Sequence, residues 1–351
     1  MWLLYHKEDR YLACLKKICC KYNRLQTRNS YRAWYGPCKI LERGEIMIWQ
    51  KTIARPITVT DIGLHSGQPV TMSLYPAAAN QGLKFIRTDL ADRPQVRAHF
   101  SRVVDTTRAT TLGEGPVTLA TVEHLLSAFY GLGVDNAIIE VDGPEVPIMD
   151  GSAKPFVDLL MKAGSTSLPW PRAYLLVHKQ VEFSNGDGWI RVVPGKPRIM
   201  YAIDFPHPLI RRQRYTVPLD SEHFRREIAP ARTFGFLKEV KLLQSRGLAR
   251  GGSLKNALVL DDSGVLNPEG LRYPEEFVRH KILDVLGDLA LVGMPILGRL
   301  EVSRGSHELH QQFVQHLIDQ ESAWRLWVPP LHNRAPRRTF EPVPLWQGSP
   351  A

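Results

Sequence analysis

The sequence predicts an α+β protein with two halves of similar plan, and three observations point to it. The 351 residues exceed one typical hydrophobic core, which favours two domains. The composition, 44% hydrophobic and 23% charged, is that of an ordinary globular protein and excludes a disordered or fibrous chain. Short β-rich runs followed by helical stretches occur twice along the chain, although no sequence repeat can be demonstrated.

The first half begins with β-rich runs and ends in two helices. The segment 57–76, ITVTDIGLHSGQPVTMSLYP, alternates short apolar runs with glycine and proline. An apolar repeat of three or four residues from Leu119 to Phe129 predicts a helix, with Thr118 or Thr121 as N-cap. Gly131 and Gly133 should close it. Further strands are predicted at 82–88, 96–104 and 136–141, and a second helix at 154–163.

The prolines at 169–171 predict the boundary between the halves. After it the same order recurs, with strands, helical stretches, another strand and a last helix. The strands are predicted at 174–183, 188–193, 199–204 and 298–303, and the last helix at 308–320. We therefore expect an N-terminal extension at 1–46, domains at 47–170 and 171–328, and a proline-rich tail at 329–351.

Residues 1–46 differ from the rest of the chain in charge and in cysteine content. They hold ten of the 45 Lys and Arg and four of the 35 Asp and Glu, so they contribute +6 of the formal +10. All four cysteines lie there, which excludes a disulfide framework or a cysteine zinc site elsewhere. The mild basic balance of the remainder suits an anionic small molecule, a membrane surface or nucleic acid equally. Without a span-length apolar run or a signal sequence, we expect a soluble, non-exported protein.

The segment 274–292, PEEFVRHKILDVLGDLALV, predicts a helix with two faces. Ile282, Val285, Leu286 and Leu289 share the apolar face. His280, Asp284 and Asp288 share another, and the i, i+4 spacing of His280 and Asp284 would let a zinc ion bridge them. A solvated helix face explains the same spacing.

Two further histidines are candidates. Glu123 and His124 are predicted to face outward near the start of the first helix, where one could bind a metal while its neighbour reaches water. A surface Glu-His pair is the simpler alternative. His307 lies at a predicted strand-to-helix junction, a common position for catalytic groups, although a capping or solvated histidine fits equally. Other motifs are missing from the sequence. The Gly-rich segment at 250–253 lacks the lysine of a phosphate-binding loop, no G-x-S-x-G motif of a serine hydrolase occurs, and no basic and aromatic run indicates RNA binding.

Together these segments resemble the zinc-dependent UDP-3-O-acyl-N-acetylglucosamine deacetylases, which catalyse the committed step of lipid A synthesis in Gram-negative bacteria. The resemblance extends from about residue 47 to about residue 325. It implies two α+β domains, each a pair of helices layered on small mixed β-sheets, with the active site between the domains. The matching segments are ITVTDIGLHSG (57–67), TVEHLLSAFYGLGVDNAIIEVDGPEVPIMDGSA (121–153), ARTFGF (231–236), GGSLKNALVLDD (251–262) and FVRHKILDVLGDL (277–289).

The resemblance also implies a role for each site residue. The zinc ligands would be His124, His280 and Asp284. The proton-transfer groups would be Glu123 as base and His307 as acid, with Asp288 paired to His307. Thr233 and Lys281 would stabilise the oxyanion, Lys281 would also contact substrate, and Leu64 and Phe234 would line the passage of the acyl chain. Two positions depart from the family: Ser306 replaces a glycine and His310 replaces an asparagine.

The implied activity is zinc-dependent hydrolysis of the acetamide of UDP-3-O-(3-hydroxyacyl)-N-acetylglucosamine, which gives acetate and the free amine. The expected partner is this acylated UDP-sugar, with no nucleic acid and at most peripheral membrane contact, and we expect a cytoplasmic monomer. One alternative is a different zinc amidohydrolase acting on another N-acyl sugar. Another is an inactive or nucleic-acid-binding protein of similar fold, against which the complete set of site residues argues.

Overall fold

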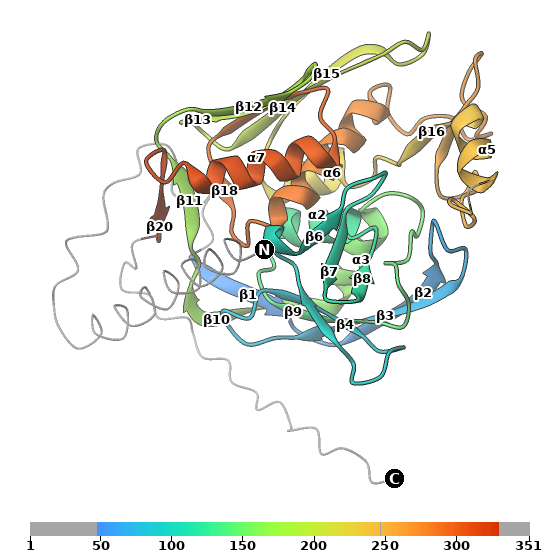
Figure 1. The fold of residues 1–351 in the computed structure, drawn as a ribbon. Coiled ribbons are helices and arrows are strands. Elements are labelled where there is room, and N and C mark those ends of the chain that lie inside the picture. The colour runs from blue at the N-terminus through green and yellow to red at the C-terminus, as the bar shows by residue number, and fades with distance from the viewer. Residues whose placement is uncertain (1–47, 246, 330–351) are drawn as a thin grey trace, which may run out of the picture.

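A computed structural model describes residues 48–245 and 247–329. In it α2 (Glu123–Leu132), α6 (Glu276–Ala290) and α7 (His307–Asp319) lie between two five-stranded sheets (Figure 1). The helices α6 and α7 lie against the upper sheet of the figure, and α2 lies between them and the lower sheet. The expected extension at 1–46, with its four cysteines, lies outside the described residues. So does the predicted tail, apart from its first residue.

The two five-stranded sheets have the same topology. Their strand orders are β2-β3-β9-β4-β5 and β12-β13-β19-β14-β15. In each sheet the one parallel pair joins the central strand to the first strand of the second hairpin, β9 with β4 and β19 with β14. The strands are β2 (Ile57–Ile62), β3 (Pro69–Pro76), β4 (Leu83–Arg87), β5 (Gln95–Arg97), β9 (Ala137–Val141), β12 (Val181–Asn185), β13 (Gly188–Val193), β14 (Arg198–Phe205), β15 (Arg211–Pro218) and β19 (Arg299–Ser303).

Each central strand also lies between two helices along the chain. In the first half α2 (Glu123–Leu132) precedes β9 and α3 (Lys154–Ala163) follows it. In the second half α6 (Glu276–Ala290) precedes β19 and α7 (His307–Asp319) follows it. The two halves therefore share one plan, two hairpins and a helix–strand–helix unit, and the predicted α+β fold is confirmed.

Smaller elements connect and flank these halves. The strand β10 contains the prolines at 169–171 and pairs with β1, so the proposed domain boundary falls within a strand and stays a prediction. The remaining strands are β1 (Trp49–Ile53), β6 (Val103–Asp105), β7 (Thr111–Glu114), β8 (Val117–Leu119), β10 (Ser165–Pro171), β11 (Tyr174–Val177), β16 (Phe234–Phe236), β17 (Leu258–Leu260), β18 (Ile296–Leu297) and β20 (Trp324–Trp327). The remaining helical segments are α4 (Ser221–His223), α5 (Leu237–Ser245), a 3₁₀ turn (Phe100–Arg102) and a π-helical turn (Phe224–Ile228).

The helices α2 and α6 pack against each other at the centre of the molecule. A Cβ atom at Gly287 of α6 would lie 2.1 Å from the carbonyl oxygen of Glu123, so only glycine permits this approach. Apolar residues on both helices, such as Phe129 and Phe277, are completely buried. The predicted apolar face of α6 is therefore in the core, but its polar face is buried as well.

The start of α2 differs from the prediction. Leu119 ends the strand β8, and the helix begins four residues later, after Val122, with no side-chain cap. Neither threonine is the cap: Thr118 lies within β8, and Thr121 has a left-handed φ of 58° and donates its hydroxyl to Glu145 at 3.2 Å. At the other end Gly133 is left-handed and closes the helix as predicted, whereas Gly131 lies inside it.

Most other elements lie where the sequence places them. The predicted elements at 82–88, 136–141, 154–163, 188–193, 199–204, 298–303 and 308–320 correspond to β4, β9, α3, β13, β14, β19 and α7. The strand predicted at 174–183 is two strands, β11 and β12, in different sheets. The strand β15 was not predicted. Within the described residues no helix has the length and apolarity that a membrane crossing requires.

Candidate active site

A buried group of two histidines and one aspartate lies where α2 and α6 cross. His124 comes from the first turn of α2, and His280 and Asp284 lie one turn apart on α6. Asp284 Oδ1 is 3.2 Å from His280 Nε2 and 3.7 Å from His124 Nε2. One ligand atom of each residue lies within 4.8 Å of the others, close enough for all three to hold one metal ion.

The protonation states of these side chains suit a metal ion. His280 Nδ1 lies 3.0 Å from the carbonyl oxygen of Ala231, which can only accept, so Nδ1 carries a hydrogen and Nε2 is the ring atom that faces Asp284. Burial, assisted by His280, lowers the pKa of His124 to about 3, so this ring is neutral. Burial opposes ionisation of Asp284, but His280 and Lys281 outweigh it and hold its pKa well below the usual value. Two imidazoles and a carboxylate whose ligand atoms converge in this way fit a divalent metal ion such as zinc.

Glu123 lies beside this group, and its two carboxylate oxygens have different surroundings. Oε2 accepts a hydrogen bond from the backbone N–H of Thr110 at 3.1 Å. Oε1 lies 3.9 Å from Nε2 of His307. Burial raises the pKa of Glu123 to about 7, against the opposing effect of His307. This carboxylate can therefore accept a proton near neutral pH. The prediction that Glu123 and His124 face outward was wrong, because α6 covers both.

His307 is the first residue of α7, at the predicted strand-to-helix junction. Its Nδ1 lies 2.8 Å from Oδ2 of Asp288. Burial by itself would lower the pKa of His307, but Asp288, through its charge and this hydrogen bond, together with Glu123, raises it to about 9. The ring is therefore an imidazolium near neutral pH and can donate a proton from Nε2. Ser306, the first departure from the family, caps α7 by accepting from Leu309 N at 3.2 Å.

Asp288 anchors a hydrogen-bond network. Oδ2 accepts from His307 and also from Nδ1 of His310 at 2.7 Å, and Oδ1 accepts from the hydroxyl of Thr110 at 2.6 Å. Burial opposes the charge of Asp288, yet both histidines hold its pKa below the usual value. Asp288, His307 and His310 also lie close enough together to resemble a second metal group. Their contacts have hydrogen-bond lengths and geometry, however, so they are satisfied without an ion.

The other predicted site residues divide into two sets. Lys281 donates to Asp284 Oδ2 at 2.9 Å and lies 5.7 Å from the ring centre of Phe234, which packs edge-on against His280. Thr233 is next to Phe234, and its N–H donates to the carbonyl of Gly151 at 2.7 Å. Lys281 and Phe234 therefore lie beside the candidate metal-ligand group, and Thr233 adjoins Phe234 in the chain. Leu64 lies between β2 and β3 instead, where its carbonyl accepts from Gly251 N at 3.0 Å.

Sequence reasoning missed Thr110 as a site residue and treated His310 only as a departure. Thr110 lies in the loop between β6 and β7, and nothing in the local sequence indicates that it contacts both Glu123 and Asp288. His310 could have been found from its spacing, because a residue three positions after His307 shares its helix face.

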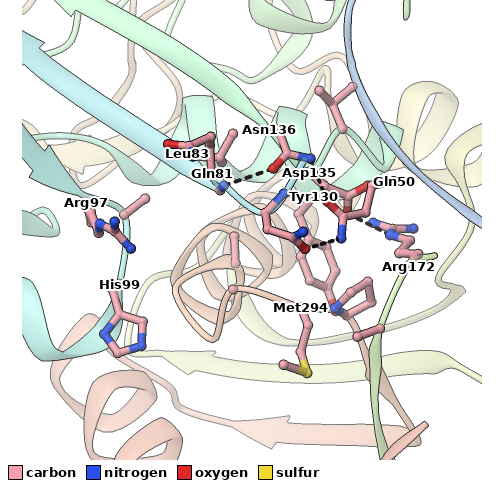
Figure 2. Close-up of a pocket in the computed structure, with 18 residues that line it drawn as sticks. Gln50, Gln81, Leu83, Arg97, His99, Tyr130, Asp135, Asn136, Arg172 and Met294 are labelled. Carbon is pink, nitrogen blue, oxygen red and sulfur yellow. Dashed lines mark hydrogen bonds and ion pairs between the residues drawn. The ribbon is translucent and has the colours of Figure 1, made fainter. Parts of the chain in front are cut away.

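A separate cavity of about 160 Å³ lies near the C-terminal end of α2 and contains none of the predicted site residues (Figure 2). Polar residues on its wall bond to one another. Gln50 Nε2 donates to Asn80 at 2.8 Å, and Arg172 Nε donates to Asp135 at 2.7 Å. Because these groups are already paired, the cavity is a weaker candidate for chemistry than the buried group on α2 and α6.

Comparisons with known proteins point to one family. The sequence model of one family, UDP-3-O-acyl N-acetylglycosamine deacetylase, matches residues 50–319. A protein of Syntrophus aciditrophicus named UDP-3-O-acyl-N-acetylglucosamine deacetylase is 47% identical over 279 residues, 79% of this chain and 89% of that protein. Proteins with the same name are 43% identical in Geotalea uraniireducens, over 86% of this chain and 99% of that protein, and 45% identical in Myxococcus xanthus, over 84% and 93%.

Proposed function

The chain belongs to the UDP-3-O-acyl N-acetylglycosamine deacetylase family, and on that premise we propose that it is a zinc metalloamidase whose ion is held by His124, His280 and Asp284. The family reaction removes the acetyl group from UDP-3-O-acyl-N-acetylglucosamine in lipid A biosynthesis. One observation carries the proposal: two imidazoles and a carboxylate are buried together, beside the carboxylate of Glu123 and the imidazole of His307.

The proton-transfer roles follow from the protonation states. A zinc ion at this position would supply Lewis-acid chemistry, polarising the acetamide carbonyl and making water more acidic. Glu123 accepts the proton of the attacking water at Oε1, because Oε2 is already bonded to Thr110 N. His307 donates the proton on Nε2 to the leaving nitrogen, which departs as the amine while acetate is released. Asp288 holds the opposite nitrogen of that ring and stabilises the imidazolium.

Lys281 and Thr233 are proposed to stabilise the oxyanion of the reacting carbonyl. Lys281 supplies a cationic amine beside Asp284, and only 24% of its side chain is exposed. Thr233 supplies a hydroxyl from the loop that also holds His280 through Ala231. Phe234 and Leu64 are proposed to line the passage of the fatty acyl chain, with Lys281 also contacting substrate oxygens.

We also propose that the protein acts as a cytoplasmic monomer. The expected substrate carries its own UDP group and acyl chain, so no nucleic acid partner is required and membrane contact would be peripheral at most. The proposed domains, 47–170 and 171–328, would then contribute Glu123 and His124 on one side and the α6 and α7 residues on the other.

Acetate release tests the proposed function. The zinc-loaded protein is given UDP-3-O-acyl-N-acetylglucosamine, or UDP-N-acetylglucosamine that lacks the acyl chain, or free N-acetylglucosamine. We expect acetate from the acylated nucleotide sugar and little from the other two. The proposed acyl passage should bind the fatty acyl chain, and basic side chains such as Lys281 should bind oxygens of the substrate. Equal rates on all three substrates would favour a general N-acyl sugar amidohydrolase, and no acetate from any would exclude the deacetylase.

A further inference from the structure

His310 shares a carboxylate oxygen with His307. The residue lies one turn later on α7 and is only 1% exposed. Its Nδ1 is 2.7 Å from Asp288 Oδ2, and the Nδ1 of His307 is 2.8 Å from the same oxygen. Their ring planes are nearly perpendicular, with centroids 6.2 Å apart. Two imidazoles on one helix thus converge on one oxygen of α6.

The proton positions in this arrangement are determined by Asp288. Because the carboxylate is ionised, it can only accept, so both Nδ1 atoms must carry hydrogen. Burial lowers the pKa of His310, whereas that of His307 is raised. His310 is therefore the neutral member, with hydrogen on Nδ1 and a lone pair on Nε2. Asp288 receives one neutral and one charged imidazole donor.

The surrounding backbone is shaped to accommodate the His310 ring. Tyr201 of β14 packs edge-on against it, with centroids 6.4 Å apart and the hydroxyl 3.5 Å from Nε2. A Cβ at Gly305 would lie 2.6 Å from His310 Nε2 and 2.4 Å from the Tyr201 hydroxyl. A larger residue at 305 would displace one of these groups. The ring is thus enclosed on both sides, with its single N–H directed at Asp288.

We propose that His310 is a positioning residue for the deacetylation, because its Nδ1–H fixes the carboxylate that orients His307. The inference rests on the proposed acid role of His307. With Thr110 bonded to Oδ1 and His310 bonded to Oδ2, rotation of the Asp288 carboxylate would break a hydrogen bond. The ring of His307 is then held with Nε2 on the Glu123 side.

The same N–H also moderates the electrostatic effect of Asp288. His307 is faced by Asp288 and Asp284 of α6, Glu123 and His124 of α2, and His310 of its own helix. His310 is faced by Asp288 and Asp284, by His307 and by Tyr201. Removing the His310 donor leaves Asp288 with the Thr110 hydroxyl and His307 as donors, so the negative charge of Asp288 acts more strongly on His307. The imidazolium should then deprotonate at higher pH.

A pair of amide variants tests the proposal. The amide nitrogen of asparagine can occupy the place of Nδ1, whereas that of glutamine falls near Nε2. We expect H310Q to have a kcat about 10- to 100-fold below that of H310N, with similar KM and with the falling limb of its pH profile at higher pH. His316→Gln, on the same helix and outside the site, is the control and should leave kcat and the pH profile unchanged.

Equal kcat values and equal pH limbs in H310N and H310Q would overturn the proposal. His310→Met, which lacks the donor, should match H310Q if both fold and bind zinc. If only H310N folds, or if none of the three does, His310 supports the fold alone and the positioning role is wrong. The proposed function has a separate test, since loss of the acid role would appear in His307→Ala, whereas these variants retain His307.

Discussion

Glu123 and His307 carry opposite charges between about pH 7 and about pH 9, although they share one buried space. Their facing atoms, Oε1 and Nε2, are 3.9 Å apart. Burial raises the pKa of Glu123 to about 7, and Asp288 overcomes burial to raise that of His307 to about 9. Between these values the carboxylate is ready to accept a proton and the imidazolium to donate one. This separation of pKa values is the physical basis for assigning one residue as base and the other as acid.

The pH dependence of turnover should be bell-shaped. Activity rises as Glu123 loses its proton, at or below about pH 7, since a bound cation would favour the carboxylate. It falls near pH 9 as His307 loses its proton. The measurement is kcat/KM across this range for the wild type and for His307→Ala. An unchanged falling limb in His307→Ala would contradict the acid assignment.

Glu123→Gln should retain the metal and lose most of the activity. The amide oxygen can still accept from Thr110 N, so the local structure is preserved, but the side chain can no longer take a proton. Loss of one positioned proton-transfer group typically costs about 10²–10⁴ in rate. Turnover and zinc content are measured on the same sample, with exposed Glu308→Gln as the control. A loss of zinc in proportion to activity would show that Glu123 is a ligand instead.

At the scale of elements, the site depends on how closely α2 and α6 approach. The helices are equivalent members of the repeated plan, and each precedes the central strand of its sheet. Gly287 allows α6 to contact the first residue of α2 directly. The crossing thereby places Glu123 and His124 against His280 and Asp284. The spacing between these helices determines the geometry of the metal-ligand group.

Gly287→Ala should therefore destabilise the protein, although alanine is ordinarily the better helix former. Its Cβ would lie 2.1 Å from the Glu123 carbonyl oxygen, which forces the helices apart. Overpacking of this kind typically costs about 1–3 kcal/mol, and displacement of Glu123 by about 1 Å can lower kcat about 100-fold. Gly264→Ala, whose Cβ has no neighbour closer than 3.8 Å, is the control. Unchanged melting temperature and turnover in Gly287→Ala would contradict this explanation.

Elements with a local signal could be predicted from the sequence, and those fixed by tertiary contacts could not. The apolar residues of α3 recur at helical spacing, and those of β13 alternate with more exposed residues. The predicted bounds of both elements match the structure. The strand β15 was missed because three of its residues, Arg211, Arg212 and Arg214, give no apolar alternation. The start of α2 was misplaced because Thr121 is held in a left-handed conformation and contacts Glu145, twenty-four residues away.

The site shows the same division. The spacing of His280, Asp284 and Asp288 on one helix face is readable from the sequence, and the structure places all three at the α2–α6 crossing or its edge. The role of Thr110 could not be predicted from the sequence, because its contacts with Glu123 and Asp288 span sequence separations of 13 and 178 residues. The spacing within each helix does not show that α2 and α6 meet, and only the family resemblance predicted that His124 lies with His280 and Asp284. Long-range pairing of this kind requires the fold.

At the scale of the whole molecule, neither half contains the complete site. The first half supplies Glu123 and His124, whereas the second supplies His280, Asp284, Asp288 and His307. Activity should thus require both halves in their native arrangement. Residues before the family match, which begins at residue 50, contribute none of these side chains.

Removal of residues 1–46 should accordingly leave folding and turnover unchanged. The segment carries all four cysteines and +6 of the formal charge, but none of the site residues. A protein beginning at Met47 is compared with the full chain by thermal unfolding and by acetate release. A large loss of either in the shorter protein would show that the extension has a role, for instance at a membrane surface.

The most direct measurement is zinc content and acetate release on one sample, before and after chelation and after zinc is restored. Because each ligand lies on a helix with its own buried apolar contacts, the metal-free protein should keep its circular dichroism spectrum while losing turnover. We expect about one zinc ion per chain in the active wild type. His280→Ala should have neither bound zinc nor activity. Full zinc content and full turnover in His280→Ala, or acetate release that survives complete chelation, would contradict the assignment of His124, His280 and Asp284 as the catalytic metal site.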